Sequence, residues 1–204
     1  IGVVADFFVP DKEFMKDSKY PEIVGNPKNP NEALFDKPVG ILVKIFSSCL
    51  KGKSSEVKSC ISILKDIESP YEILRQDSRK GKYIWDRFQK INKNYEFLLK
   101  KALSVKPENG FYVFTYETFD NSFTSQISTE IAYKVKAKIF VVARESSGDM
   151  RISIRSKDIN IPPILDKIFK QIPGRGGGHD YACGAQVNKD YFGKFIELFK
   201  KEIS

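Results

Sequence analysis

The only histidine of the chain closes a run of glycines in the stretch IPGRGGGH, residues 172–179. Glycine lets the backbone adopt positive φ angles and approach a ligand closely. Consecutive backbone N–H groups in such a loop form a concave surface that suits an anion, and arginine and histidine side chains add hydrogen-bond donors. The pattern therefore predicts an anion-binding loop made of Gly174, Arg175, Gly176, Gly177, Gly178 and His179.

Two other kinds of glycine-rich loop do not fit this stretch. A Walker A loop requires Lys-Ser or Lys-Thr after its last glycine, whereas His179 and Asp180 follow here. A dinucleotide-binding fingerprint joins a strand to a helix, whereas this run follows a predicted helix and precedes a predicted strand. A tight helix-to-strand turn stays open as the alternative, although a turn needs fewer glycines than the run contains.

A second group of polar residues lies in the stretch MRISIRS, residues 150–156, which predicts a β-strand. Alternate residues of a strand share a face, so Arg151, Ser153 and Arg155 lie on one side and Ser156 on the other. Two arginines that flank a serine form a strip that could bind phosphate. An ordinary exposed strand face is the alternative.

Hydrophobic periodicity predicts the elements that position these residues. Residues 1–9 are expected to form a buried strand or helix end, and the proline-rich residues 10–38 a loop-rich connection. Helices are predicted over residues 41–50 and 54–68, followed by a short helix and a long amphipathic one. The remainder reads β-α-β-β-α-β-α, with strands at 110–116, 138–145, 150–156 and 182–187. We therefore expect a mixed α/β fold in which this C-terminal domain follows a mostly helical region.

Charge is unevenly distributed along the chain, whose formal net charge is +8. Residues 1–36 carry four Lys and seven Asp or Glu, whereas residues 37–107 carry 16 Lys or Arg against seven acidic residues. A basic segment is typical of a protein that contacts a phosphate backbone, and a solvated lysine-rich surface is the alternative. The cations of the predicted long helix include Lys82, Arg87, Lys90, Lys93 and Lys100.

Cysteine usage and hydropathy exclude two classes of protein. Cys49, Cys60 and Cys183 share no CxxC spacing, and one histidine does not complete a zinc site with them, so we expect three small core residues. No apolar run approaches the roughly 20 residues that a membrane span needs. No signal-peptide pattern opens the sequence, and we expect a cytoplasmic protein with no membrane association.

The C-terminal stretches resemble the DHH-associated domain of DHH phosphoesterases, a family that includes RecJ nucleases, oligonucleotide-degrading enzymes and cyclic-dinucleotide phosphodiesterases. The resemblance rests on residues 153–156, SIRS, and residues 176–184, GGGHDYACG, and it extends over residues 110–204. It implies that Arg155 and the GGGH segment hold the phosphate and the terminal nucleotide of a substrate. The sequence departs from many members at Asp180 and Tyr181, where proline is common.

The N-terminal stretch IGVVADFFVPD resembles the last motif of the catalytic DHH domain in RecJ-like proteins, and Asp6 matches the aspartate beside its metal site. The resemblance implies three parts. Residues 1–38 would be the end of a DHH-type domain, residues 39–107 a basic helical linker, and residues 108–204 the DHH-associated nucleic-acid-binding domain.

The resemblance also sets what catalysis would require. The two metal ions of the family, Mn²⁺ or Mg²⁺, are held by an Asp-x-Asp segment and an Asp-His-His triplet, and neither is present here. We therefore expect no cofactor for this chain. Asp6 would be a metal ligand only if a catalytic DHH domain preceded Ile1. Whether the chain is such a fragment, or a protein that kept binding and lost catalysis, is left open by the sequence.

These observations predict a protein that binds single-stranded DNA or RNA, or a strand end, without catalysing its hydrolysis. Archaeal RecJ-like relatives without catalytic motifs associate with the GINS complex and the MCM helicase at replication forks, so the resemblance implies these as partners. The alternative is the C-terminal part of an active exonuclease or oligonucleotide phosphodiesterase. A third hypothesis is a replication scaffold in which protein contacts outweigh nucleic-acid binding.

Overall fold

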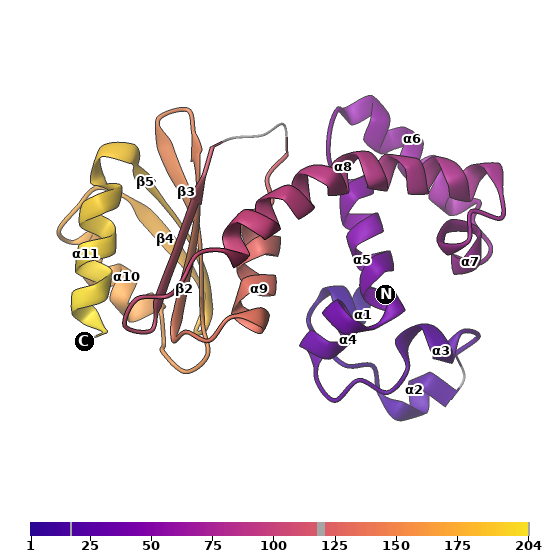
Figure 1. The fold of residues 1–204 in the computed structure, drawn as a ribbon, viewed down its shortest axis with the longest axis horizontal. Helices are drawn as coiled ribbons and strands as arrows, with labels where there is room; N and C mark the ends of the chain where they lie inside the picture. The colour runs from indigo at the N-terminus through magenta and orange to yellow at the C-terminus, as the bar shows by residue number, and fades with distance from the viewer. Residues whose placement is uncertain (17, 118–120, 204) are drawn as a thin grey trace. The chain divides into compact units, whose positions relative to one another are not determined.

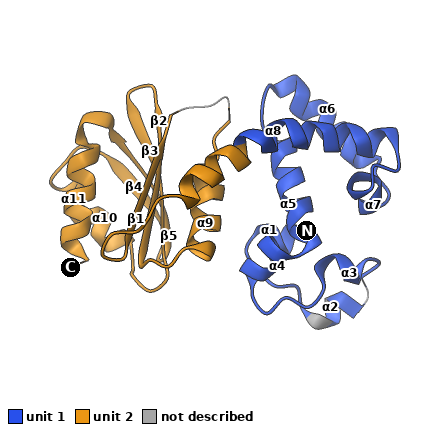
Figure 2. Ribbon diagram, viewed as in Figure 1, with its two compact units in different colours: residues 1–94 blue, residues 95–204 orange. Residues whose placement is uncertain are grey.

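The structure is a computed structural model that describes residues 1–16, 18–117 and 121–203. It divides into two compact units, residues 1–94 and residues 95–204 (Figure 2). Helix α8 (Arg79–Leu103) supplies residues to both units. None of the helices in the described ranges is both long enough and apolar enough to cross a membrane.

The first unit is helical. Its helices are α1 (Gly2–Ala5), α2 (Lys12–Lys16), α3 (Pro21–Val24), α4 (Pro30–Asp36), α5 (Pro38–Cys49), α6 (Ser54–Lys65), α7 (Pro70–Leu74) and the first part of α8. The loop-rich connection predicted over residues 10–38 is therefore wrong in part, because three short helices and the start of α5 lie there. The reason is that proline is well tolerated in the first turn of a helix, where its missing N–H has no partner to lose.

The core of the first unit gathers around α5. Leu42 and Ile45 on this helix are buried, and they belong to the same cluster as Val4 of α1 and Ile84 of α8. The predicted burial of all three cysteines is confirmed. Burial raises the pKa of Cys49 to about 12, so this thiol stays protonated.

The second unit contains a five-stranded sheet of order β1-β2-β3-β5-β4. Its strands are β1 (Phe111–Tyr116), β2 (Ile139–Ser146), β3 (Asp149–Ser156), β4 (Arg175–His179) and β5 (Ala182–Asn188). β1 and β2 are parallel and the other neighbours are antiparallel. The mixed α/β fold is as predicted, with one strand added, because the glycine run itself forms β4 at the edge of the sheet.

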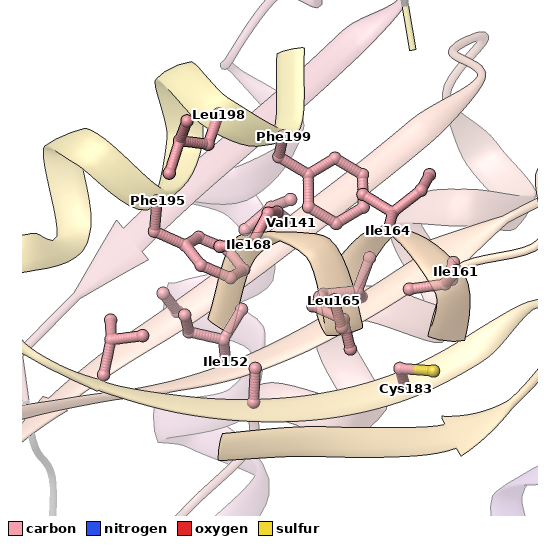
Figure 3. Packing of buried hydrophobic residues seen from close by; sticks show 14 of the residues in the cluster. Val141, Ile152, Ile161, Ile164, Leu165, Ile168, Cys183, Phe195, Leu198 and Phe199 are labelled. Carbon is pink, nitrogen blue, oxygen red and sulfur yellow. The ribbon is translucent and has the colours of Figure 1, made fainter. Parts of the chain in front are cut away.

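Helices cover both faces of this sheet (Figure 1). α9 (Thr124–Lys134) packs on β2 and β3 from one side, while α10 (Pro162–Phe169) and α11 (Phe192–Glu202), which follows the short 3-10 helix η1 (Lys189–Tyr191), lie on the other. On the α10 and α11 side, Phe195 and Phe199 pack with Leu165 over Val141 and Ile152 (Figure 3). Successive residues of a strand point to opposite faces, so the residues next to Val141 and Ile152 in the sequence face α9 or solvent.

Candidate anion-binding site

The register of the sheet brings the predicted site residues onto one face. Residues directly opposite each other on paired strands share a face, and β3, β5 and β4 form three such rows. The arginine row is Arg151, Gln186 and Arg175; the glycine row is Ser153, Gly184 and Gly177; the histidine row is Arg155, Ala182 and His179. The opposite face of the same strands carries the core residues Ile152, Ile154, Cys183 and Ala185.

Arg155 is held by hydroxyl and carbonyl groups rather than by a carboxylate. Its Nη2 donates to Ser125 Oγ at 2.9 Å and its Nε to Thr129 Oγ1 at 3.3 Å, both on α9. Its Nη1 donates to Ser153 Oγ and to the Ile154 carbonyl, each at 2.9 Å. Burial lowers the pKa of Arg155, and no ion pair with a described acidic residue offsets this cost. A bound anion would offset it, and an arginine whose geometry is fixed in advance suits phosphate.

The two serines predicted to contact phosphate lie beneath or beside this arginine. Ser153 is only 6% exposed and forms a 2.9 Å hydrogen bond with Ser128 as well as accepting from Arg155. Ser156 Oγ accepts from the backbone N–H groups of Asp158 and Ile159 and so stabilises the turn after β3. Both serines therefore support the local structure: Ser153 helps to hold Arg155, and Ser156 stabilises the turn after β3.

Most glycines of the run are explained by close packing of β4. A Cβ at Gly174 would lie 2.5 Å from the Phe169 ring, one at Gly176 would lie 2.8 Å from the Gly184 carbonyl oxygen, and one at Gly178 would lie 2.4 Å from the Ala182 carbonyl oxygen. Only Gly178 in the run has a φ in the region that favours glycine, at +150°. The predicted loop of positive-φ glycines is thus wrong, because these glycines let an edge strand pass closely over its neighbours.

Two glycines of this face remain without such an explanation. A Cβ at Gly177 would meet nothing within 4 Å, and a Cβ at Gly184 would have its nearest neighbour, the Ile152 carbonyl oxygen, at 3.8 Å. Neither backbone has a positive φ. They are neighbours in the glycine row, between the two rows that carry the arginines and His179. A side chain at either position would fill the open space over this face, which the glycines leave accessible to a ligand.

His179 borders a hollow at the end of β4. The hollow has a volume of about 380 Å³ and is lined by Gly178, His179, Asp180, Tyr181 and Ala182. Tyr181 is 50% exposed, which offers an aromatic ring for stacking beside the histidine. Sequence reasoning missed this tyrosine and noted it only as a departure from proline. The exposed aromatic next to the histidine is the signal that could have found it.

The structure separates the remaining predicted residues. Arg155 and His179 share a row, whereas Arg175 lies at the other end of β4, where its Nη2 donates to Gln186 Oε1 at 3.0 Å. Asp6 follows α1 in the first unit and is exposed. Over the described ranges, no cluster of three His, Cys, Asp or Glu residues could hold a metal ion, so the described residues do not fit a two-metal site.

Comparisons with known proteins identify a domain family and similar folds. Residues 109–204 match the family model of the DHHA1 domain. No curated protein matches the sequence. The structure is similar to RecJ in complex with Mg²⁺ from Thermus thermophilus, with a TM-score of 0.59 and 16% identity over 98% of this chain and 33% of that chain. It is also similar to PggH, a pGpG-specific phosphodiesterase from Vibrio cholerae, with a TM-score of 0.57 and 12% identity over 84% of this chain and 61% of that chain.

This chain therefore spans about a third of the length of that RecJ structure. The match of the family model begins just before β1 and includes every strand of the sheet and the face with the three rows. The helical first unit lies outside it but within the part that is similar in fold to RecJ. The C-terminal part of this chain, residues 109–204, is a DHHA1 domain.

Proposed function

We propose that the face formed by the three rows binds the sugar-phosphate backbone of single-stranded nucleic acid and holds a strand end beside His179. The observation that carries the proposal is the open glycine row next to the uncompensated guanidinium of Arg155. Because glycine has no Cβ, a sugar-phosphate backbone can lie directly on the strands at these positions. A fixed arginine at the border of that surface supplies the charge that a phosphate requires.

Each group of the face has a distinct role in this proposal. Arg155 binds a phosphate, and His179 donates to the same phosphate or to the terminal sugar from the same row. The exposed backbone of β4, an edge strand, offers N–H groups along the ligand. Tyr181 stacks on a terminal base, a sequence-tolerant interaction.

The similar structures support a ligand of this class without defining it. PggH is named as specific for pGpG, which is a short chain of nucleotides. RecJ was crystallised with Mg²⁺, and the similar part is 33% of that RecJ chain. If the chain is part of such an enzyme, our second candidate function is the substrate-holding part of an exonuclease or oligonucleotide phosphodiesterase. Mn²⁺ or Mg²⁺ would then be held by a catalytic domain to which Asp6 contributes.

The finer predictions on biological context stay predictions. An archaeal RecJ-like protein at the replication fork would associate with GINS and MCM, and co-purification of the chain with GINS subunits would test this. DNA and RNA would be distinguished by competition between matched deoxyribose and ribose oligonucleotides, because only RNA carries the 2′-hydroxyl.

A binding experiment tests the proposal directly. The parent chain and Arg155→Gln are titrated into a fluorescently labelled, 5′-phosphorylated single strand, with Lys201→Gln on α11 as the control for loss of one exposed positive charge. We expect Arg155→Gln to bind at least tenfold more weakly and Lys201→Gln to bind like the parent. Equal affinity of Arg155→Gln and the parent would contradict the proposal.

A further inference from the structure

The arginine row extends onto β2, where it gains a residue that the sequence did not single out. The β2–β3 register places Arg144 directly opposite Arg151, so three arginines and Gln186 follow one another across four strands, from β2 to β4. Like charges directly opposite each other on neighbouring strands are destabilising. A row of this kind therefore needs a counter-charge, either from the protein or from a ligand.

The described residues supply little of that counter-charge. No ion pair joins Arg144 or Arg151 to any acidic residue within ranges 1–16, 18–117 and 121–203. Glu145, the next residue on β2, is paired with Lys189 at 2.8 Å. Asp149 is the acidic residue nearest in sequence on β3, and its Oδ2 accepts from Gln186 Nε2 at 2.5 Å.

Arg144 also carries an unsatisfied group. Its Nε is buried and has no hydrogen-bond partner among the described residues. A buried donor without a partner is costly and usually marks a ligand or an ordered water that is not yet in place. Arg144 lies at the half-buried side of the row, with Arg151 exposed next to it. Together they offer donors to an anion that lies over β2 and β3.

We propose that Arg144 and Arg151 form a second phosphate subsite, and that the ligand is therefore an oligonucleotide with at least two phosphates. This inference rests on the proposed function of the histidine row. The two rows are four residues apart along β3, or about 13 Å between Cα atoms at the rise of a strand. The glycine row lies between them. One phosphate does not span both rows, whereas a single strand that passes over the open glycines of β5 and β4 has one phosphate at each row and another between them.

The test compares ligands of different length on the intact chain. A 5′-phosphorylated mononucleotide, dinucleotide and tetranucleotide are titrated into the ¹⁵N-labelled parent, Arg144→Gln, Arg144→Lys and Arg155→Gln, with Lys201→Gln as the control. The amide spectrum shows whether each variant is folded, and the shifts of the glycine signals give each affinity.

We expect the parent to bind the tetranucleotide at least tenfold more tightly than the mononucleotide. Arg144→Gln should lose most of this gain while its mononucleotide affinity stays that of the parent, and Arg144→Lys should keep part of it. Arg155→Gln should weaken all three ligands. The inference is overturned if Arg144→Gln retains the full gain, or weakens the mononucleotide equally. Absence of binding of every ligand by the parent would instead overturn the proposed function itself.

Discussion

Replacing Gly177 by alanine should raise stability and lower affinity at once. The added methyl group meets no protein atom within 4 Å, and the φ of Gly177 lies outside the region that favours glycine. Alanine at such a position reduces the freedom of the unfolded chain and should stabilise the fold by about 0.4–1 kcal/mol, or roughly 1–4 °C in Tm. The same methyl group would stand in the glycine row, where we place the ligand.

A displaced phosphate would lose at least one charge-assisted hydrogen bond, worth about 1.5–3 kcal/mol, so affinity should fall roughly 10- to 150-fold. Fluorescence anisotropy with a labelled single strand measures the affinity, and thermal unfolding by circular dichroism measures Tm. Gly193→Ala is the matched control, since a Cβ there also meets nothing within 4 Å and the residue lies on α11. Unchanged affinity of Gly177→Ala, together with a raised Tm, would refute the reasoning that the row is open for a ligand.

Three further predictions follow from the same structure. Arg155→Ala should weaken single-strand binding by about 1–3 kcal/mol, measured by the same anisotropy titration, and an affinity equal to that of the parent would argue against its role. Changing the exposed Lys82, Lys90 and Lys93 to glutamine should flatten the log–log dependence of affinity on salt by about 0.7 for each phosphate that they neutralise, and an unchanged slope would make them a solvated surface. The purified chain should release no mononucleotide from a labelled strand with or without Mn²⁺, and metal-dependent release that is lost in Asp6→Ala would show an enzyme instead.

Local periodicity predicted which face of β3 carries the charged residues. The alternation in MRISIRS required Arg151 and Arg155 to lie opposite Ile152 and Ile154, and the core of the second unit has that arrangement. The glycine run was predicted as a loop because glycine readily adopts positive φ angles. Its strand structure depends on pairing with β5 and on the ring of Phe169, which are contacts between distant residues.

Residues whose roles depend on long-range contacts were assigned incompletely. Arg87 was predicted among the basic residues of the long helix that attract nucleic acid. In the structure its Nη2 donates to the Lys51 carbonyl and lies 3.4 Å from Glu56 Oε2, so its charge is paired within the protein. Arg144 follows the apolar residues of the strand predicted over residues 138–145, and it belongs to no motif that we recognised in the sequence. Only the register of β2 against β3 reveals that it stands beside Arg151.

The central claim is that single-stranded nucleic acid lies on the three rows of the sheet. Titrating a 5′-phosphorylated oligonucleotide into the ¹⁵N-labelled chain tests it most directly, because glycine amides report contacts at single residues. We predict that the largest shifts occur at Gly177, Gly178, His179 and Gly184, with Gly193 on the opposite side of the sheet unchanged. Shifts confined to α8 or α11, with none on β4 and β5, would contradict the account.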